Sequence, residues 1–156
     1  MMLVPFLRSP RVEDTLTREL ISGHVRSLMA NHLADVSSSD KHTVKPWFNG
    51  KLDFSPPVEN LVEQGFPLVG GRLDYLDNRP VAALVYQRKK HFINVFIWPS
   101  TQSSETGTKP VTLQGYRLFQ WVRSGMTFWA VSDLEESELQ EFVRLLQKQV
   151  PSASNK

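Results

Sequence analysis

Five short runs rich in β-branched and aromatic residues limit most strongly what this chain can fold into. The runs are GRLDYL (71–76), RPVAALVYQ (79–87), HFINVFIWP (91–99), GYRLFQWV (115–122) and MTFWAVS (126–132). Their composition is typical of strands, and turn signals follow three of them, at Asp77-Asn78, at 88–90 and at Ser124-Gly125. Because short hairpins join antiparallel neighbours, we expect a largely antiparallel sheet of about five strands, arranged as a meander.

Counting back from these turns predicts which side chains share a face. A two-residue turn at Ser124-Gly125 places Trp121 opposite Phe128 and Phe119 opposite Ala130. The turn at 88–90 separates two sets of apolar residues, with Leu84, Tyr86, Ile93 and Val95 on one face and Phe92, Phe96 and Trp98 on the other. Neither face is polar, so we expect both faces to be covered by other segments or by a partner.

A helix is predicted at each end of the sheet. Over residues 13–33 the spacing of Ile21, Val25, Leu28 and His32 predicts an amphipathic helix with this stripe buried. A second helix follows the last strand, where Asp133 and Glu136 have capping-box spacing. Its expected apolar stripe is Leu139, Phe142, Val143, Leu146 and Val150.

The predicted elements indicate one α+β domain over residues 13–150. Residues 1–12 are expected to be a linker and 151–156 a flexible tail. The polar stretch at 100–114 is expected to be a mobile excursion between strands. A chain of 156 residues suits a single domain of this kind.

Composition excludes several classes of protein. With 18 basic and 16 acidic residues and no cysteine, the chain has no nucleic-acid footprint, no disulfide framework and no thiolate metal site. It has no stretch that approaches the ~18 apolar residues of a spanning helix. We therefore expect a chain that is soluble as given.

The stretch SSDKHTVKPWFNGKLDFSPP, which ends at Pro57, shows no helical or strand period. Its prolines predict an extended conformation, because proline disfavours the helical region for the residue before it. Its apolar residues predict burial, so we interpret it as an ordered strap over the sheet face of Phe96 and Trp98. The alternative is a recognition surface with exposed aromatic anchors. The candidate residues for either role are Asp40, His42, Lys45, Trp47 and Phe48.

Catalytic and metal sites have weak support in the sequence. His24 and His32 lie two helical turns, about 12 Å, apart and cannot share one metal ion, so we expect His24 to be a hydrogen-bonded core residue. Ser39, Asp40 and His42 contain the triad residue types, but crowding within a few residues is not evidence for a triad. We expect no catalytic residue, no metal and no cofactor.

The glycine pair Gly70-Gly71 lacks the pattern of a phosphate-binding loop. No helix is expected to follow it, and it stands at the start of a predicted strand. We interpret it as a bulge or as a place where another backbone approaches closely. Asp74 and Asp77 are expected to be solvated.

Several motifs together resemble a known family. They are HVRSLMANHLADVSSSDKHTVKPWFNGKLDFSPPV, GFPLVGGRLDYLDNRPVAALVY, the spaced H..N.F.WP, and FWAVSDL. They resemble the C-terminal, extracytoplasmic region of bacterial transmembrane anti-sigma factors, which regulate sigma factors of the extracytoplasmic-function group. The likeness runs from about residue 24 to residue 142, and its most specific part lies between Asp40 and Pro57.

This resemblance implies a non-catalytic sensory or interaction domain on the periplasmic side of the inner membrane. In the family, a cytoplasmic helical domain binds the sigma factor and one helix crosses the membrane; this sequence is expected to lack both. The implied partners are proteins of the cell envelope or a second copy of the chain, with no nucleic acid. A free-standing periplasmic ligand- or protein-binding module is the alternative, and a Ser/His hydrolase is the third hypothesis.

Overall fold

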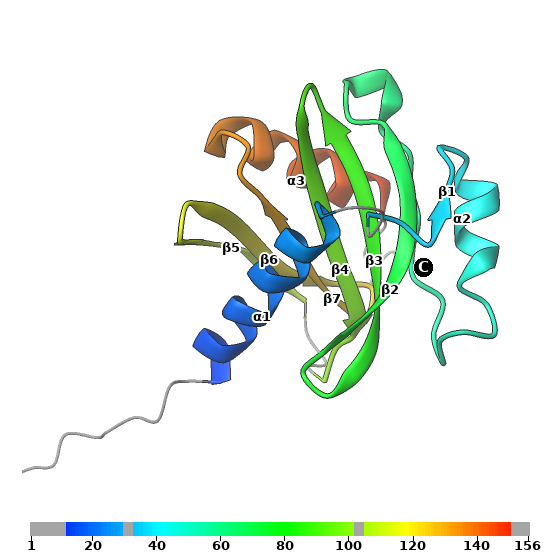
Figure 1. The fold of residues 1–156 in the computed structure, drawn as a ribbon, viewed down its shortest axis with the longest axis horizontal. Coiled ribbons are helices and arrows are strands. Elements are labelled where there is room, and N and C mark those ends of the chain that lie inside the picture. Colours follow the sequence, from blue (N-terminus) through cyan, green and yellow to red (C-terminus); the bar gives the residue numbers. More distant parts are fainter. Residues whose placement is uncertain (1–11, 30–32, 102–104, 151–156) are drawn as a thin grey trace, which may run out of the picture.

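The computed structural model describes residues 12–29, 33–101 and 105–150 and has three α-helices and seven strands in this part of the chain (Figure 1). The helices are α1 (Val12–Ser27), α2 (Lys41–Trp47) and α3 (Glu136–Gln149), with a 3-10 turn η1 (Val62–Gln64). The strands are β1 (Val36–Ser37), β2 (Leu68–Leu76), β3 (Arg79–Arg88), β4 (His91–Pro99), β5 (Thr106–Leu113), β6 (Tyr116–Arg123) and β7 (Met126–Ser132). The α+β class is confirmed, with seven strands in place of about five.

The seven strands form one antiparallel sheet in the order β1-β2-β3-β4-β7-β6-β5. The predicted turns are confirmed: Asp77, Asn78, Ser124 and Gly125 all have positive φ, as the tightest hairpin turns require. A simple meander is wrong, because β4 pairs with β7 and not with β6. The last hairpin inserts β7 into the middle of the sheet, where its nearly continuous apolar run is buried from both sides.

Strand β5 corrects the expectation of a mobile excursion at 100–114. A turn at Gln114-Gly115, with φ of 54° and 82°, folds β5 back on β6. The strand is polar because it lies at the edge of the sheet and is mostly exposed, where Lys109 and Pro110 discourage pairing with another chain. Residues 102–104, within the same stretch, lie outside the described residues.

The predicted register and faces of the sheet are confirmed. Trp121 pairs with Phe128, and their rings stack with centroids 5.0 Å apart. One face, the α3 face, carries Leu84, Tyr86, Ile93 and Val95 under α3. The opposite face, the α1 face, carries Phe96, Trp98, Leu118 and Trp129 under α1. Figure 1 shows the two helices on opposite sides of the sheet.

Helix α3 buries most of the stripe that its sequence predicts. Leu139, Phe142, Val143 and Leu146 lie in the core of the α3 face, and Val150 at its C-cap joins them. The predicted capping box at Asp133 is wrong, because the helix begins at Glu136 and its N-cap residue makes no side-chain cap hydrogen bond. Asp133 instead lies 2.9 Å from Nδ1 of His91, a contact that joins the end of β7 to the start of β4.

Helix α1 buries a different stripe from the predicted one. Leu20, Ile21, His24 and Ser27 face the sheet, while Val25 and Leu28 are 38% and 45% exposed. Of the predicted stripe, Ile21 is buried as expected, whereas Val25 and Leu28 are not; the sheet offers hydrogen-bond partners that draw His24 and Ser27 inward. His32 and the expected helical residues 30–32 lie outside the described residues.

The segment from residue 38 to 57 is not wholly extended, because it contains α2 with Pro46 in its last turn. Asp40 caps this helix, since its side chain accepts a hydrogen bond from the backbone N–H of His42. Val44 and Phe48, four residues apart, are buried and point to one side of the helix. Lys45 precedes Pro46 and would ordinarily favour extended backbone. Here the Asp40 cap and the burial of Val44 and Phe48 favour the helix instead.

The strap interpretation is correct in the burial of Phe48 and wrong in the face on which Trp47 and Phe48 pack. Val44 and Phe48 pack in the core of the α3 face, and Trp47 is half-buried against it. These three residues lie at the β2 edge of the sheet and belong to the α3 face, whereas Phe54 of the same segment packs against both faces, including the cluster of Phe96 and Trp98 beneath α1.

The glycine pair allows this edge to form, and both interpretations of it are confirmed. The ladder between β2 and β3 is irregular between Leu68 and Gly70. A Cβ atom at Gly70 would collide with the carbonyl oxygen of Val36 in β1, and one at Gly71 would lie 2.9 Å from the ring of Phe48.

We expect Phe48→Ala to lower the free energy of unfolding by about 3–5 kcal/mol, because it removes a fully buried ring from the α3-face core. Trp47→Ala should cost less, since Trp47 is only half-buried. Lys51→Ala, at an exposed position whose ammonium lies 4.6 Å from the Trp47 ring, should cost less than about 1 kcal/mol. Urea unfolding of the three variants measures these values. A free energy of unfolding for Phe48→Ala equal to that of the wild type would contradict the assignment of Phe48 to the core.

Candidate functional site

Asp40 and His42 are brought together as parts of the N-terminal cap of α2. The Asp40 carboxylate accepts a hydrogen bond of 2.8 Å from the backbone N–H of His42, and the Asp40 N–H donates to Oγ of Ser38. Ser39 contributes its carbonyl to the Asn60 amide, 2.7 Å away. These hydrogen bonds all involve backbone groups, as those of Ser and Asp side chains in loops commonly do.

Lys45 fastens α2 to the chain that follows it. Its ammonium donates a 2.8 Å hydrogen bond to the carbonyl of Pro56, and partial burial lowers the pKa of the Lys45 ammonium. The neighbouring Lys41 pairs with Glu59 at 3.1 Å, and the carbonyl of Glu59 accepts from the hydroxyl of Tyr86. Together with His42, these lysines line a shallow hollow of about 340 Å³ against Pro57 and Val58.

A second cluster, beneath α1, holds more unusual chemistry. The polar cluster consists of His24 and Ser27 from α1, Arg72 and Asp74 from β2, and Asn94 from β4. Arg72, Asp74 and Asn94 project from the α1 face because side chains on one face of a strand recur at every second residue. Four of the five members, all except Asp74, are buried.

Arg72 is the centre of the polar cluster. Its guanidinium donates to Oδ1 of Asn94 at 2.5 Å and to Oδ2 of Asp74 at 3.2 Å. It also donates to the carbonyls of Gly23, at 3.4 Å, and Leu33, at 3.2 Å. A buried cation needs such partners to offset the loss of its hydration. Burial nevertheless lowers the pKa of Arg72, and Asp74 opposes that shift.

The hydrogen bonds of Arg72 determine the tautomer of His24. A guanidinium can only donate, so the atom of Asn94 that faces Arg72 is its carbonyl oxygen. The Asn94 NH₂ group then faces Nδ1 of His24 at 2.7 Å and Oγ of Ser27 at 3.0 Å. Nδ1 must therefore accept, which leaves His24 neutral with its proton on Nε2.

The surroundings of His24 oppose its protonation. Burial lowers the pKa of His24 from 6.5 to about 4; Asp133 acts in the opposite direction and Arg72 lowers it further. Nε2 is buried and has no hydrogen-bond partner among the described residues. The ring of Tyr116 lies edge-on to the imidazole at 5.4 Å. The prediction that His24 is a hydrogen-bonded core residue is confirmed.

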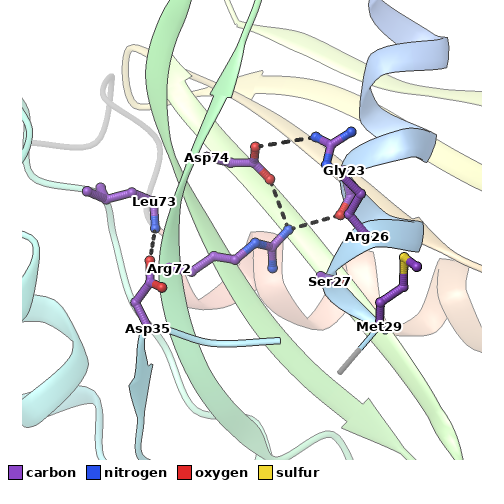
Figure 2. Close-up of a pocket in the computed structure, with 8 residues that line it drawn as sticks. All are labelled: Gly23, Arg26, Ser27, Met29, Asp35, Arg72, Leu73 and Asp74. Carbon is purple, nitrogen blue, oxygen red and sulfur yellow. Dashed lines mark hydrogen bonds and ion pairs between the residues drawn. The ribbon is translucent and has the colours of Figure 1, made fainter. Parts of the chain in front are cut away.

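Beside the polar cluster lies an open cleft of about 560 Å³ (Figure 2). It is lined by Gly23, Arg26, Ser27, Met29, Asp35, Arg72, Leu73 and Asp74. Figure 2 shows Asp74 between two arginines, with Arg72 below it and Arg26 of α1 across the cleft, 3.8 Å from Oδ1. The expectation that Asp74 is solvated is wrong: this carboxylate joins α1 to β2.

None of the predicted site residues belongs to the polar cluster, although the sequence held a signal for it. Asn94 interrupts the apolar run FINVFIW, and Arg72 and Asp74 stand two residues apart within a strand. A polar residue in a strand that is otherwise buried on both faces needs a partner. The positions alone could not say that these three residues would meet under α1.

Among residues 12–29, 33–101 and 105–150, no group of three or more His, Asp or Glu side chains is placed to hold a metal ion. Within the same residues, no helix is long and apolar enough to cross a membrane. A comparison of the chain with protein-family models, curated proteins and solved structures finds no match.

We expect stability to fall in mild acid because of His24. The folded-state pKa lies below the ordinary value, so the contribution of the neutral ring is complete above about pH 6.5 and is lost as pH falls toward 4. The difference between these two pKa values corresponds to a loss of about 3 kcal/mol in the free energy of unfolding. Urea unfolding across this range should show a steeper pH dependence for the wild type than for His24→Asn, which keeps an acceptor near the Nδ1 position. His42→Asn, at an exposed position, should show the same pH dependence of stability as the wild type. If His24→Asn also shows the wild-type pH dependence, His24 is not the cause of the loss of stability in acid.

Proposed function

We propose that the chain is the extracytoplasmic sensory and interaction domain of a transmembrane anti-sigma factor. Its role is non-catalytic: it controls the release of a sigma factor that a separate cytoplasmic domain holds. The first support is the resemblance of residues 24–142 to that region of the family. A tether in the inner membrane would place the domain on the periplasmic side.

The observation that carries the proposal is that residues between Asp40 and Pro57, the most specific part of the resemblance, make structural contacts. Asp40 caps α2, Lys45 binds the Pro56 carbonyl, and Phe48 fills the α3-face core. Such contacts build a fold and leave the exposed surface to recognise partners. A segment with this pattern fits an interaction domain better than an enzyme.

The attachment of α1 supports a sensory role. In the family, the membrane helix precedes this region, so α1 would be the element nearest to the membrane. Its contact with the sheet combines Leu20 and Ile21 with the polar cluster. A partner that displaced α1 would break these directional hydrogen bonds. The domain would then have two distinguishable arrangements, one with α1 docked on the sheet and one with α1 released.

A free-standing periplasmic binding module is the second candidate. The cleft of about 560 Å³ beside Arg72, Asp74 and Arg26 presents both signs of charge to a ligand. The exposed apolar side chains of Val25, Leu28 and Met29 at the end of α1 offer an envelope protein or a second copy of the chain a contact surface.

Deletion of the gene tests the proposal. We expect transcription from the promoters of one extracytoplasmic-function sigma factor to rise, because an inhibitor has been removed. The reading frame upstream of Met1 should also encode an apolar helix of ~20 residues, preceded by a small helical domain. Unchanged transcription in the deletion strain, together with an upstream region that encodes neither, would favour the free-standing module.

We also expect no hydrolase activity. Asp40 is engaged with the α2 backbone and so is not oriented to support His42 as a general base. A panel of ester and peptide substrates at several pH values measures this, with His42→Ala as the matched variant. Turnover by the wild type that is lost in His42→Ala would establish the hydrolase hypothesis instead.

A further inference from the structure

The hydrogen bonds of the polar cluster form a chain with only one workable direction. Arg72 donates to Asn94, and Asn94 donates to His24. Each step is forced by the one before it, because a guanidinium has no acceptor and an amide has one oxygen and one NH₂ group. The chain links β2, β4 and α1, so it holds the helix on the sheet.

We propose that Arg72, Asn94 and His24 form an acid-sensitive latch, which holds α1 on the sheet at neutral pH and releases it when His24 takes up a proton. The latch is a property of this chain and does not depend on the anti-sigma role.

A protonated His24 has donors at both ring nitrogens and no acceptor. The new proton on Nδ1 would face the Asn94 NH₂ group across 2.7 Å. A flip of the Asn94 amide would satisfy His24 but would point its NH₂ group at Arg72, 2.5 Å away. No orientation of Asn94 serves both cations, and Nε2 already has no partner within the part of the chain that the structure describes.

The charges that face His24 from the surrounding elements do not remove this conflict. Arg72 of β2 is buried, remains charged across the range and repels an imidazolium. Asp74 of β2 is already shared between Arg72 and Arg26 of α1. Asp133 favours the charged ring, but it is paired with His91. Tyr116 of β6 presents an aromatic ring.

Release of α1 need not unfold the rest of the domain. The apolar contacts of α1 belong to the α1-face cluster, where it contributes Leu20 and Ile21 with support from Leu16. The α3-face core contains residues of α2, α3 and the opposite side of the sheet, and none of the α1 side chains that the structure describes. The end of α1 is already exposed at Val25 and Leu28.

Single cysteines can test the latch, because the chain has none of its own. Ile21→Cys reports on the buried face of α1, and Val143→Cys reports on α3. Each full-length variant is treated with a disulfide reagent that reacts in acid, and its rate is divided by that of the urea-unfolded variant at the same pH. For a His24 pKa of about 4 when docked and 6.5 when released, linkage predicts docking about 20-fold weaker at pH 5 than at neutral pH.

We expect accessibility at Ile21→Cys to rise by about this factor while Val143→Cys stays protected. An equal rise at both positions would mean global unfolding and would overturn the latch. Asn94→Asp supplies the decisive second variant, because a carboxylate accepts from both Arg72 and a protonated His24. It should keep α1 docked in acid, whereas His42→Asn should behave as the wild type. Release in Asn94→Asp that matches the wild type would also overturn the proposal.

Discussion

A cation buried between a helix and a sheet needs more hydrogen-bond acceptors than one element can supply. Arg72 draws its acceptors from Asp74 on its own strand, Asn94 two strands away, and the carbonyls of Gly23 and Leu33. To meet this need, α1 must lie where its carbonyl at Gly23 reaches the guanidinium. The rotation of α1 about its axis, the burial of His24 and the exposure of Val25 and Leu28 all follow from that position.

The two faces of the sheet are stabilised in different ways. The α3 face is a continuous apolar core in which Phe142 packs against Phe66 and Tyr86, with ring centroids 5.3 and 4.9 Å apart. The hydrophobic effect that drives apolar packing of this kind is non-directional. The α1 face adds directional hydrogen bonds to a smaller apolar cluster. Contacts of that kind are well suited to switching, because they are either made or broken.

The edge of the sheet shows why the stretch between Asp40 and Pro57 is so dense in different residue types. Each residue type meets a separate local demand: Asp40 caps a helix, Lys45 binds a carbonyl, and Phe48 fills the space above Gly71. For an interaction domain, a rigid edge of this kind would fix the outer surface of α2 for a partner. Ser39, Asp40 and His42 of the same stretch contain the triad residue types, but the hydrogen bond between Asp40 and His42 is made by the His42 backbone.

Local patterns in the sequence were enough to predict the strands from β2 to β4, the hairpin of β6 and β7, and the stripe of α3, because hairpin turns and side-chain periods act over a few residues. They did not predict β5, whose polar composition hides an edge strand, or α2, where burial overrides the effect of Pro46. The burial of His24 was predicted, but the partners that it meets in the polar cluster were not. Arg72 and Asn94 are 22 residues apart, and Asn94 and His24 are 70 apart. Only the pairing of β2, β3 and β4 brings these side chains together, and only their contact makes it favourable to bury His24 in place of Val25.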